Sequence, residues 1–528
     1  MDISSIWRNT IKFSWKRENS WLKKIILFVC IFLFIGLFIF ISTDSQQESI
    51  TFFVADGELS EPSIETSTSF DIKDVVKNFT VTKNSQTIGE AVVTERQFPN
   101  GDSLIFVDFH SPNQDNTFIV NVAESTEITK QTKVDTSIKE LYPYRKDRKV
   151  VDPLSTTWNY IETKNMSLLI GTQVMYKDIS YTYEKSNETS TVYQFLEELN
   201  AANMTEKGLK IGVHANKSRG STWLMRSNEH LFNDQEELVN AHEIGVDEFR
   251  WITPNATLSH LPSSAFPSHP NAFVRSLVRQ SGRSSTIALE KESTRFFENM
   301  NRHQFKSLED ARNKDGLWYS NYTSTWLERA YGFGPNYVDS RHNDNIFRSQ
   351  LRRAEILGYE KYANNIEVYA DYLIRMANQG YTIQTDNGYY LIDYYDTDSK
   401  TLTHTSLNHV LSLMNYLYYA YMETGNSEYL DAANLQLTAL KDTGTDWINE
   451  NGEVNYQLKL DGSFSGKDYN LVTYYDLMYT KKLLQQLDMP SVPIVEELIT
   501  VKKNNLREQG LEFESNIDVI EDYVGLIE

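Results

Sequence analysis

Tyrosines that stand beside acidic or amide residues near the C-terminus are the best candidates for chemistry in this 528-residue chain. An ionised carboxylate accepts a proton readily, whereas a tyrosine, with a usual pKa of about 10, needs a neighbouring cation before it can act as a base. The chain has 31 tyrosines, so any one of them is more often a packing residue or a platform for a sugar ring. Four residues stand out because they lie in segments that connect predicted helices, where functional side chains concentrate. These candidate acid–base residues are Asp393, Tyr394, Tyr456 and Tyr469, with Tyr395 and Tyr475 as alternatives.

A cluster of arginines precedes these segments, between Arg275 and Arg353. Arginine is the side chain best suited to bind a carboxylate through two parallel hydrogen bonds. Arg341, Arg348 and Arg352 are therefore candidates to bind a substrate that carries a carboxylate. For any single arginine, the alternative is a solvated helix face on which it pairs with acidic neighbours.

The elements that must position these residues are amphipathic helices. Apolar residues recur at intervals of three, four and seven over Asn345–Leu357, Tyr362–Ala377 and Ser406–Met422, which predicts helices with one buried face. Gly358 and Gly425 each end one predicted helix and are followed four residues later by a tyrosine. A glycine there accepts the left-handed conformation that closes a helix. Two such joints predict stacked α-hairpins.

The order of these features resembles the C-terminal domain of the D-glucuronyl C5-epimerase family. That family has a Glu-Tyr pair before a helix that begins Leu-Asn-Gly, and this chain has Asp393-Tyr394-Tyr395 before Leu407-Asn408-His409. The family's Tyr-Asp-Leu-Arg-His and Trp-Asp-Tyr-His segments correspond here to Asn455-Tyr456-Gln457-Leu458-Lys459 and Lys467-Asp468-Tyr469-Asn470. The resemblance spans roughly Asp315 to Leu487.

The resemblance implies that residues 271–487 form an α/α toroid-like domain, an incomplete barrel, that epimerises hexuronic acid residues of an anionic polysaccharide at C5. That reaction removes the proton beside the sugar carboxylate and returns one to the opposite ring face. It needs a cation for the carboxylate and two proton-transfer groups. By the resemblance, Asp393 and Tyr394 lie on one side of the sugar, and Tyr456 and Tyr469 on the other.

Two alternative functions remain open. In a uronic-acid lyase, the same proton is removed and the intermediate then eliminates. In a polysaccharide-binding or assembly protein, the fold is kept without catalysis. Asp393 in place of the family's Glu and Asn470 in place of its His favour this last alternative.

The N-terminus predicts a membrane anchor. Residues 1–24 are basic, and residues 25–41 form an unbroken apolar run. Such a run, flanked by tryptophan and lysine, spans a bilayer with its basic side in the cytoplasm. A cleaved signal peptide is the alternative, but no small-x-small cleavage site follows the run. Residues 42–78 then predict a stalk, and the bulk of this single-pass protein of the cell membrane is expected outside the cell.

Residues 79–265 are expected to be β-rich and sandwich-like, with a small α/β module. Alternating segments separated by Asn- and Pro-containing turns predict antiparallel strands at Phe79–Thr82, Gly89–Arg96, Ser103–Phe109 and Thr117–Val122. The module is predicted from alternating elements: a helix over Thr191–Ala202, a strand over Leu209–Val213, a helix over Asp234–Glu243 and a strand over Val246–Ile252. Residues 488–528 are predicted as a C-terminal extension with a helix over Ile494–Lys503.

Charge and cysteine content exclude several classes of protein. The net charge of −21 argues against a nucleic-acid partner, since phosphate binding needs a basic surface. The single cysteine, Cys30, lies in the apolar run, so neither an intramolecular disulfide nor a thiolate metal site is expected. The histidines have no metal-binding spacing and no cofactor motif occurs. A structural calcium ion on the acidic loops and a homodimer stay open.

Overall fold

The computed structural model describes most of the chain after the apolar run. The described residues are 50–122, 128–134, 157–164, 166–199, 202–205, 208–292, 294–396 and 400–524. The predicted basic tail and membrane segment, residues 1–41, lie outside this set, so the anchor stays a prediction. Among the described residues, no helix is both long and apolar enough to cross a membrane.

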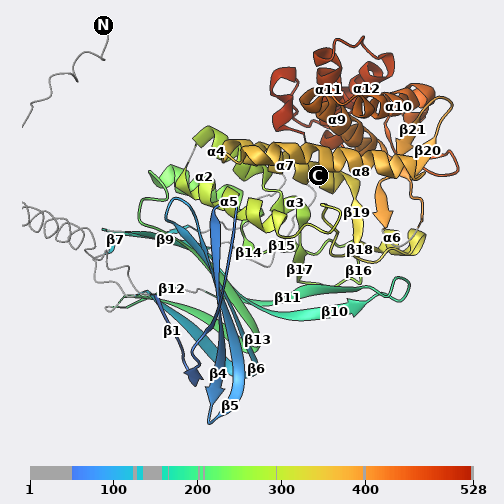
Figure 1. The fold of residues 1–528 in the computed structure, drawn as a ribbon. Coiled ribbons are helices and arrows are strands. Elements are labelled where there is room, and N and C mark those ends of the chain that lie inside the picture. Colours follow the sequence, from blue (N-terminus) through green and yellow to red (C-terminus); the bar gives the residue numbers. More distant parts are fainter. Residues whose placement is uncertain are drawn as a thin grey trace, which may run out of the picture. The chain divides into compact units, whose positions relative to one another are not determined.

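Long antiparallel strands dominate the first half of the described chain (Figure 1). β4 (Ile72–Lys83), β5 (Gln86–Gln97), β6 (Ser103–Val122) and β13 (Gly208–Ser227) lie side by side in one sheet. Asn84-Ser85 joins β4 to β5 with φ angles of 50° and 63°, a two-residue turn whose twist suits a hairpin. The other strands of this sheet are β1 (Ile50–Val54), β2 (Glu58–Leu59), β3 (Ser63–Ser69), β7 (Ile128–Val134), β8 (Trp158–Thr163), β9 (Ser167–Ile170), β10 (Gln173–Thr182), β11 (Thr189–Leu199), β12 (Ala202–Thr205), β14 (Trp251–Thr253), β15 (Ala256–His260) and β17 (Ala272–Arg275).

Several predictions for this half are wrong because strand pairing between distant segments overrides local signals. Residues 50–78, predicted as part of a stalk, form β1 to β3 and the start of β4. Residues 191–199, predicted as helical, belong to β11, which pairs with β10 along its whole length. β6 continues through the turn predicted between Phe109 and Thr117, because β13 pairs with it on both sides of that point. The predicted turn coincides instead with a shift in the register of this pairing. The strands share one continuous sheet rather than the two sheets of a sandwich.

The α/β module expected around residues 191–252 is therefore not a separate unit. Its predicted strand at Leu209–Val213 is the start of β13. Its second predicted helix, over Asp234–Glu243, is confirmed as α2 (Gln235–Glu248). Asp234 caps α2, because its carboxylate accepts a 2.9 Å hydrogen bond from the backbone N–H of Glu237. The strand predicted from Val246 is short, since α2 extends to Glu248.

Helices dominate after the sheet (Figure 1). They are α3 (Leu277–Gln280), α4 (Arg283–Glu292), α5 (Arg295–Glu309), α6 (Thr325–Tyr331), α7 (Ser340–Ile356), η2 (Glu360–Asn365), α8 (Ile366–Asn378), α9 (Leu407–Thr424), α10 (Ser427–Thr443), η3 (Gly444–Trp447), α11 (Leu471–Gln486), α12 (Pro493–Glu508) and η4 (Ile517–Asp522). Short strands lie between them: β16 (Ala265–Phe266), β18 (Thr323–Ser324), β19 (Tyr337–Asp339), β20 (Thr382–Gln384), β21 (Tyr389–Leu391), β22 (Tyr394–Asp396), β23 (Thr405–Ser406), β24 (Asn455–Leu458) and β25 (Phe464–Lys467).

The predicted helical hairpins are confirmed. α7 packs on α8, α9 on α10 and α11 on α12, while α9 also contacts α7, α8 and α11. As a result, 13 of the 18 residues of α9 are buried. Gly358 and Gly425 have φ angles of 75° and 72°, and Tyr362 and Tyr429, four residues later, are buried.

A buried network of hydrogen bonds connects the sheet to helix α5. Arg96 of β5 is fully buried and donates two 2.9 Å hydrogen bonds to the carboxylate of Asp74. Its Nη1 lies 2.7 Å from Nδ1 of His303 on α5. Because a guanidinium can only donate, His303 must accept through an unprotonated Nδ1. Burial, Arg96 and Arg353 lower the pKa of His303 well below its usual value.

His303 should therefore make the protein less stable in mild acid. Below about pH 6.5, the unfolded chain binds a proton at this histidine and the folded chain does not, so a fall in pH favours unfolding. His303→Asn keeps an acceptor for Arg96 but cannot be protonated. Chemical denaturation at several pH values should show a shallower loss of unfolding free energy in the variant than in the wild type. Equal slopes would mean that His303 has an ordinary pKa.

Candidate active site at the start of helix α9

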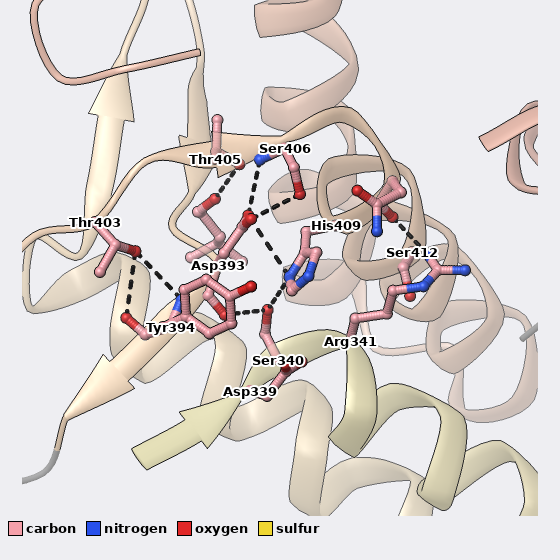
Figure 2. Close-up of polar contacts among 12 residues, drawn as sticks. Asp339, Ser340, Arg341, Asp393, Tyr394, Thr403, Thr405, Ser406, His409 and Ser412 are labelled. Carbon is pink, nitrogen blue, oxygen red and sulfur yellow. Dashed lines mark hydrogen bonds and ion pairs between the residues drawn. The ribbon is translucent and has the colours of Figure 1, made fainter. Parts of the chain in front are cut away.

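Asp393 is the centre of a buried polar cluster (Figure 2). It lies between β21 and β22 and is fully buried. Its carboxylate accepts hydrogen bonds from the backbone N–H of Ser406 at 2.9 Å and from the Ser406 hydroxyl at 2.6 Å. Ser406 is the N-cap residue of α9, and its own side chain does not cap the helix. Asp393 therefore places a negative charge where the positive end of the helix dipole favours it.

The starts of α7 and α9 meet at this residue. The backbone N–H and the hydroxyl of Ser340 both donate to the carbonyl of Asp393, at 3.1 Å and 2.8 Å. The Asp393 N–H donates to the carbonyl of His404 at 3.1 Å. β19 pairs with β22, with Asp339 opposite Tyr394. Short strands thus fix the position of Asp393 before either helix begins.

Two buried histidines flank the carboxylate. Nε2 of His404 lies 3.2 Å from Asp393 Oδ2, and Nδ1 of His409 lies 3.6 Å from Oδ1. His409 Nδ1 also lies 2.9 Å from the hydroxyl of Ser340. Burial acts to raise the pKa of Asp393, but the two histidines and the Ser406 hydrogen bonds outweigh it and lower that pKa below its usual value. Burial lowers the pKa of His409, against the opposing effect of Asp393.

The four predicted acid–base residues come together around His404. The ring of Tyr394 lies 5.7 Å from that of His404 and 5.6 Å from that of His409, measured between centroids. The ring of Tyr456 lies 6.0 Å from His404 and 5.7 Å from Tyr469. Tyr469 is 38% exposed. A row of rings therefore leads from the buried carboxylate to the protein surface.

Their surroundings keep two of these tyrosines protonated. Burial is the main cause that raises the pKa of Tyr394 and of Tyr456 well above the usual value, and the charge of Asp393 adds to it. Hydrogen bonds of Tyr456 with Ser406 and Tyr394 oppose this rise. At neutral pH both phenols are hydrogen-bond donors. A basic group in this cluster must therefore be Asp393, a histidine, or a tyrosine whose proton a histidine takes up.

Sequence reasoning missed three members of the cluster: His404, Trp326 and Tyr331. The hydroxyl of Tyr331 lies 3.4 Å from Nδ1 of His404, and the two rings are stacked with 11° between their planes. The ring of Trp326 packs edge-on against His404 at 4.8 Å and is 44% exposed. Both aromatic residues belong to α6, more than 70 positions before His404 in the sequence. No local pattern could link them to it.

Trp326 also borders a hollow on the surface. This hollow has a volume of about 440 Å³ and is lined by Ser264, Thr325, Trp326, Arg329 and Ala330. Arg329 is exposed. An aromatic face beside a guanidinium offers stacking for a sugar ring and two hydrogen bonds for a carboxylate.

The structure separates the three predicted substrate-binding arginines. Arg341 is 5% exposed and donates to the carboxylate of Asp476 at 2.6 Å and to the carbonyl of Asn408 at 2.7 Å. Arg348 and Arg352 line a different cavity, farther along α7. From position 341 to position 352, an α-helix rises by about 16 Å. Arg341 therefore lies in a buried ion pair, whereas Arg348 and Arg352 lie at a separate cavity.

The predicted C-terminal extension is part of the helical core. Val495 and Leu498 of α12 are buried in the same apolar cluster as α9 and α11. Lys502, also on α12, lies 2.8 Å from the carboxylate of Asp468 and donates to the carbonyl of Tyr469. α12 therefore fixes the backbone that carries Tyr469.

Metal chemistry has no evident ligand set in the described part of the chain. No group of three or more His, Cys, Asp or Glu side chains there is arranged to hold a metal ion. In the cluster itself, both oxygens of Asp393 already accept hydrogen bonds from Ser406.

The sequence matches no protein-family model and no curated protein. Structures similar to this chain include a D-mannose isomerase, at 17% identity and a TM-score of 0.34 over 46% of this chain and 63% of that one. A glycoside hydrolase family 76 mannosidase from Bacteroides thetaiotaomicron has 13% identity and a TM-score of 0.37 over 51% and 71% of the two chains. A cellobiose 2-epimerase from Bacillus thermoamylovorans has 9% identity and a TM-score of 0.34 over 44% and 60%.

These three structural neighbours are a sugar isomerase, a glycoside hydrolase and a sugar epimerase. The chain spans less than two thirds of the length of the D-mannose isomerase and of the cellobiose 2-epimerase. With TM-scores below 0.4, the likeness identifies neither a family nor a reaction.

Proposed function

We propose that this protein is a polysaccharide-modifying enzyme that epimerises hexuronic acid residues at C5. The observation that carries the proposal is the buried Asp393–His404 pair with two tyrosine hydroxyls connected to it. Tyr331 reaches Nδ1 of His404. Tyr456 reaches the carboxylate through its hydrogen bond with Ser406. Two phenols that share one imidazole and one carboxylate suit a reaction that takes a proton from one ring face and returns one to the other.

In the proposed reaction, the proton transfers balance within this cluster. Burial raises the pKa of Tyr331, so its phenol stays protonated in the resting site. It passes its own proton to Nδ1 of His404 only as its oxygen takes the proton from C5. Tyr456 then gives its proton to the opposite face of C5. The imidazolium proton on Nε2 returns to Tyr456 through Asp393 and Ser406. Both phenols recover their protons, and His404 ends as the tautomer from which the reverse reaction starts.

The negative intermediate needs a cation, because the proton beside an ionised carboxylate is very weakly acidic. We assign this role to Arg329, since Arg341 is already paired with Asp476. In this proposal Trp326, three residues before Arg329 on α6, stacks on the sugar ring. Tyr469, in the segment between β25 and α11, covers the same ring.

Deuterium exchange tests the reaction class. The full chain is incubated in heavy water with a hexuronate polysaccharide, and the sugar is then analysed by NMR. Epimerisation should place deuterium at C5 and give both C5 configurations, with no rise in ultraviolet absorbance. A rise from an unsaturated product would indicate the lyase instead. Binding of the polysaccharide with neither result would indicate the non-catalytic alternative.

Tyr456→Phe should lower C5 exchange by about 10²–10⁴-fold, the usual contribution of one acid–base group. The change removes a single hydroxyl and keeps the ring that packs against His404 and Tyr469. Tyr469→Phe is the matched control and should have a smaller effect, because in this proposal Tyr469 covers the sugar with its ring, which phenylalanine keeps. Exchange rates from NMR measure both variants. A larger loss in Tyr469→Phe than in Tyr456→Phe would exchange their assigned roles.

A further inference from the structure

A second cavity lies along α7 from Asn345 onward and beside the later turns of α9 and α11. Its volume is about 880 Å³, within the range of small-molecule sites. Its walls include Asn345, Arg348, Tyr359 and Tyr419. The start of α9 at the Asp393 cluster and Tyr419 are separated by about 18 Å of helix rise. No residue that lines this cavity belongs to the Asp393 cluster.

Asn345 is the most informative residue of this cavity. It is only 6% exposed, and within the described part of the chain neither its amide oxygen nor its amide nitrogen has a hydrogen-bond partner. The same holds for Nη2 of Arg348 on the next turn. Buried polar groups without partners are uncommon and destabilising, so a group left in this state calls for an explanation.

The charged residues of the cavity argue against an ionic ligand. Arg348 donates to Asp344 at 2.7 Å, and Arg352 pairs with Glu290 and Asp522. Carboxylates therefore already neutralise both guanidinium charges, which leaves little attraction for an anion. Exposed Glu355 and Glu423 line the same cavity and would repel it. A cation would meet the Arg348 guanidinium, whose centre already lies 5.3–5.7 Å from three tyrosine rings, those of Tyr416, Tyr419 and Tyr479.

An uncharged ligand rich in hydroxyl groups can supply the hydrogen-bond partners that Asn345 and Arg348 lack. An amide such as that of Asn345 needs one acceptor and one donor, and a hydroxyl supplies both, whereas a carboxylate or phosphate only accepts and an ammonium only donates. The remaining Nη2 of Arg348 needs one more acceptor. The tyrosine rings of the wall offer flat apolar faces for the C–H face of a sugar.

We propose that this cavity binds an uncharged oligosaccharide, through Asn345 and Arg348, at a site distinct from the Asp393 cluster. The proposal does not depend on the C5 reaction. The cavity would give the protein a second binding site for a glycan. This site would exist whether or not the Asp393 cluster is catalytic.

Saturation-transfer NMR with the full chain tests the proposal. The probes are neutral gluco-, manno-, galacto- and xylo-oligosaccharides, and a hexuronate oligosaccharide is the charged comparison. At least one neutral probe should bind to the wild type. Asn345→Leu, which has nearly the same shape, should weaken that binding by about tenfold, the effect of two lost hydrogen bonds. Asp393→Asn should leave it unchanged.

Thermal unfolding separates binding from a structural role. Asn345→Leu removes no internal hydrogen bond, so its Tm without ligand should equal or exceed that of the wild type. The matched control is Asn415→Leu on α9, where the amide donates to the carbonyl of Asp476 at 3.0 Å and accepts from Thr480 at 2.9 Å. This control should lower the Tm and leave glycan affinity unchanged in the folded protein.

Four results would overturn the proposal. The first is that no neutral probe binds to the wild type. The second is that Asn345→Leu binds the probe as well as the wild type does. The third is that Asn345→Leu lowers the Tm as Asn415→Leu does, which would make Asn345 a structural residue. Displacement of the neutral probe by the hexuronate oligosaccharide would also contradict a site for uncharged sugars.

Discussion

Asp393→Asn should lower C5 exchange into a hexuronate polysaccharide by about 10⁴-fold, the effect of the same change in a Ser-His-Asp triad. The asparagine oxygen can still accept the hydrogen bond from the Ser406 N–H, so α9 should keep its start. Its amide group, however, donates toward Nε2 of His404, and the imidazole must then carry its proton on Nδ1. That nitrogen can no longer accept the proton of Tyr331, which lies 3.4 Å away.

The pH dependence of stability gives a second measurement on the same variant. The pKa of Asp393 is lowered in the folded protein, so the unfolded state binds a proton more readily. The stabilisation from this carboxylate is therefore complete above about pH 4, the pKa of an unfolded aspartate, and is lost as the pH falls below that value. The difference in unfolding free energy between wild type and Asp393→Asn should shrink over that acidic range.

Asp442→Asn is the matched control for Asp393→Asn. Asp442 also accepts hydrogen bonds from a neighbouring segment, at Asn387 and Thr385, and its pKa is lowered mainly by them. It contacts no residue of the Asp393 cluster in the hydrogen bonds described. Exchange should therefore stay at the wild-type rate. If both variants exchange normally, Asp393 is a structural cap of α9 and the proposed proton path is wrong.

Arg341→Met should lower the free energy of unfolding by about 3–5 kcal/mol, the usual cost of breaking a buried ion pair on one side. Arg341 and Asp476 are both nearly inaccessible to solvent, and their charges lie 2.6 Å apart. Removal of the guanidinium leaves the carboxylate of Asp476 buried without its cation. It also leaves the carbonyl of Asn408, in the first turn of α9, without this donor. Chemical denaturation measures the loss.

Two variants make this prediction specific. Arg352→Met breaks an ion pair whose side chains are each 31% exposed, so the loss should be about 1 kcal/mol or less. Adding Asp476→Leu to Arg341→Met should restore much of the stability, since no unpaired charge is then buried. A stable Arg341→Met protein with a raised KM for the hexuronate polysaccharide would instead assign Arg341 to the substrate, as the arginine pattern of the sequence suggested.

Much of the helical half follows from local sequence. The spacing of apolar residues on α7, α8 and α9 predicts their buried faces, and a glycine that takes a positive φ, as Gly358 and Gly425 do, ends a helix whatever surrounds it. These signals are contained within one or two helical turns. The same is true of the tyrosines in the connecting segments, which the sequence alone selects as candidates.

The strands were harder to predict, because their structure depends on partners far along the chain. β11 was predicted as a helix, yet it is held in an extended conformation by β10 and β17. Residues 50–78 have the polar composition of a linker, yet they form β1 to β3 and the start of β4, which pair within the sheet. Pairing with a distant strand satisfies the backbone N–H and C=O groups of a segment. It can therefore override the preference of that segment's own residues for another conformation.

The sequence by itself thus determined the helical hairpins, their joints, and Asp393, Tyr394, Tyr456 and Tyr469 as candidates. Only the tertiary structure decided which residues meet them. It brought α6, with Trp326 and Tyr331, to His404, and it divided the predicted arginines between a buried ion pair and a second cavity. The physical reason is that helix spacing places a residue on a face of its own helix, whereas the packing of the helices and short strands determines what that face meets.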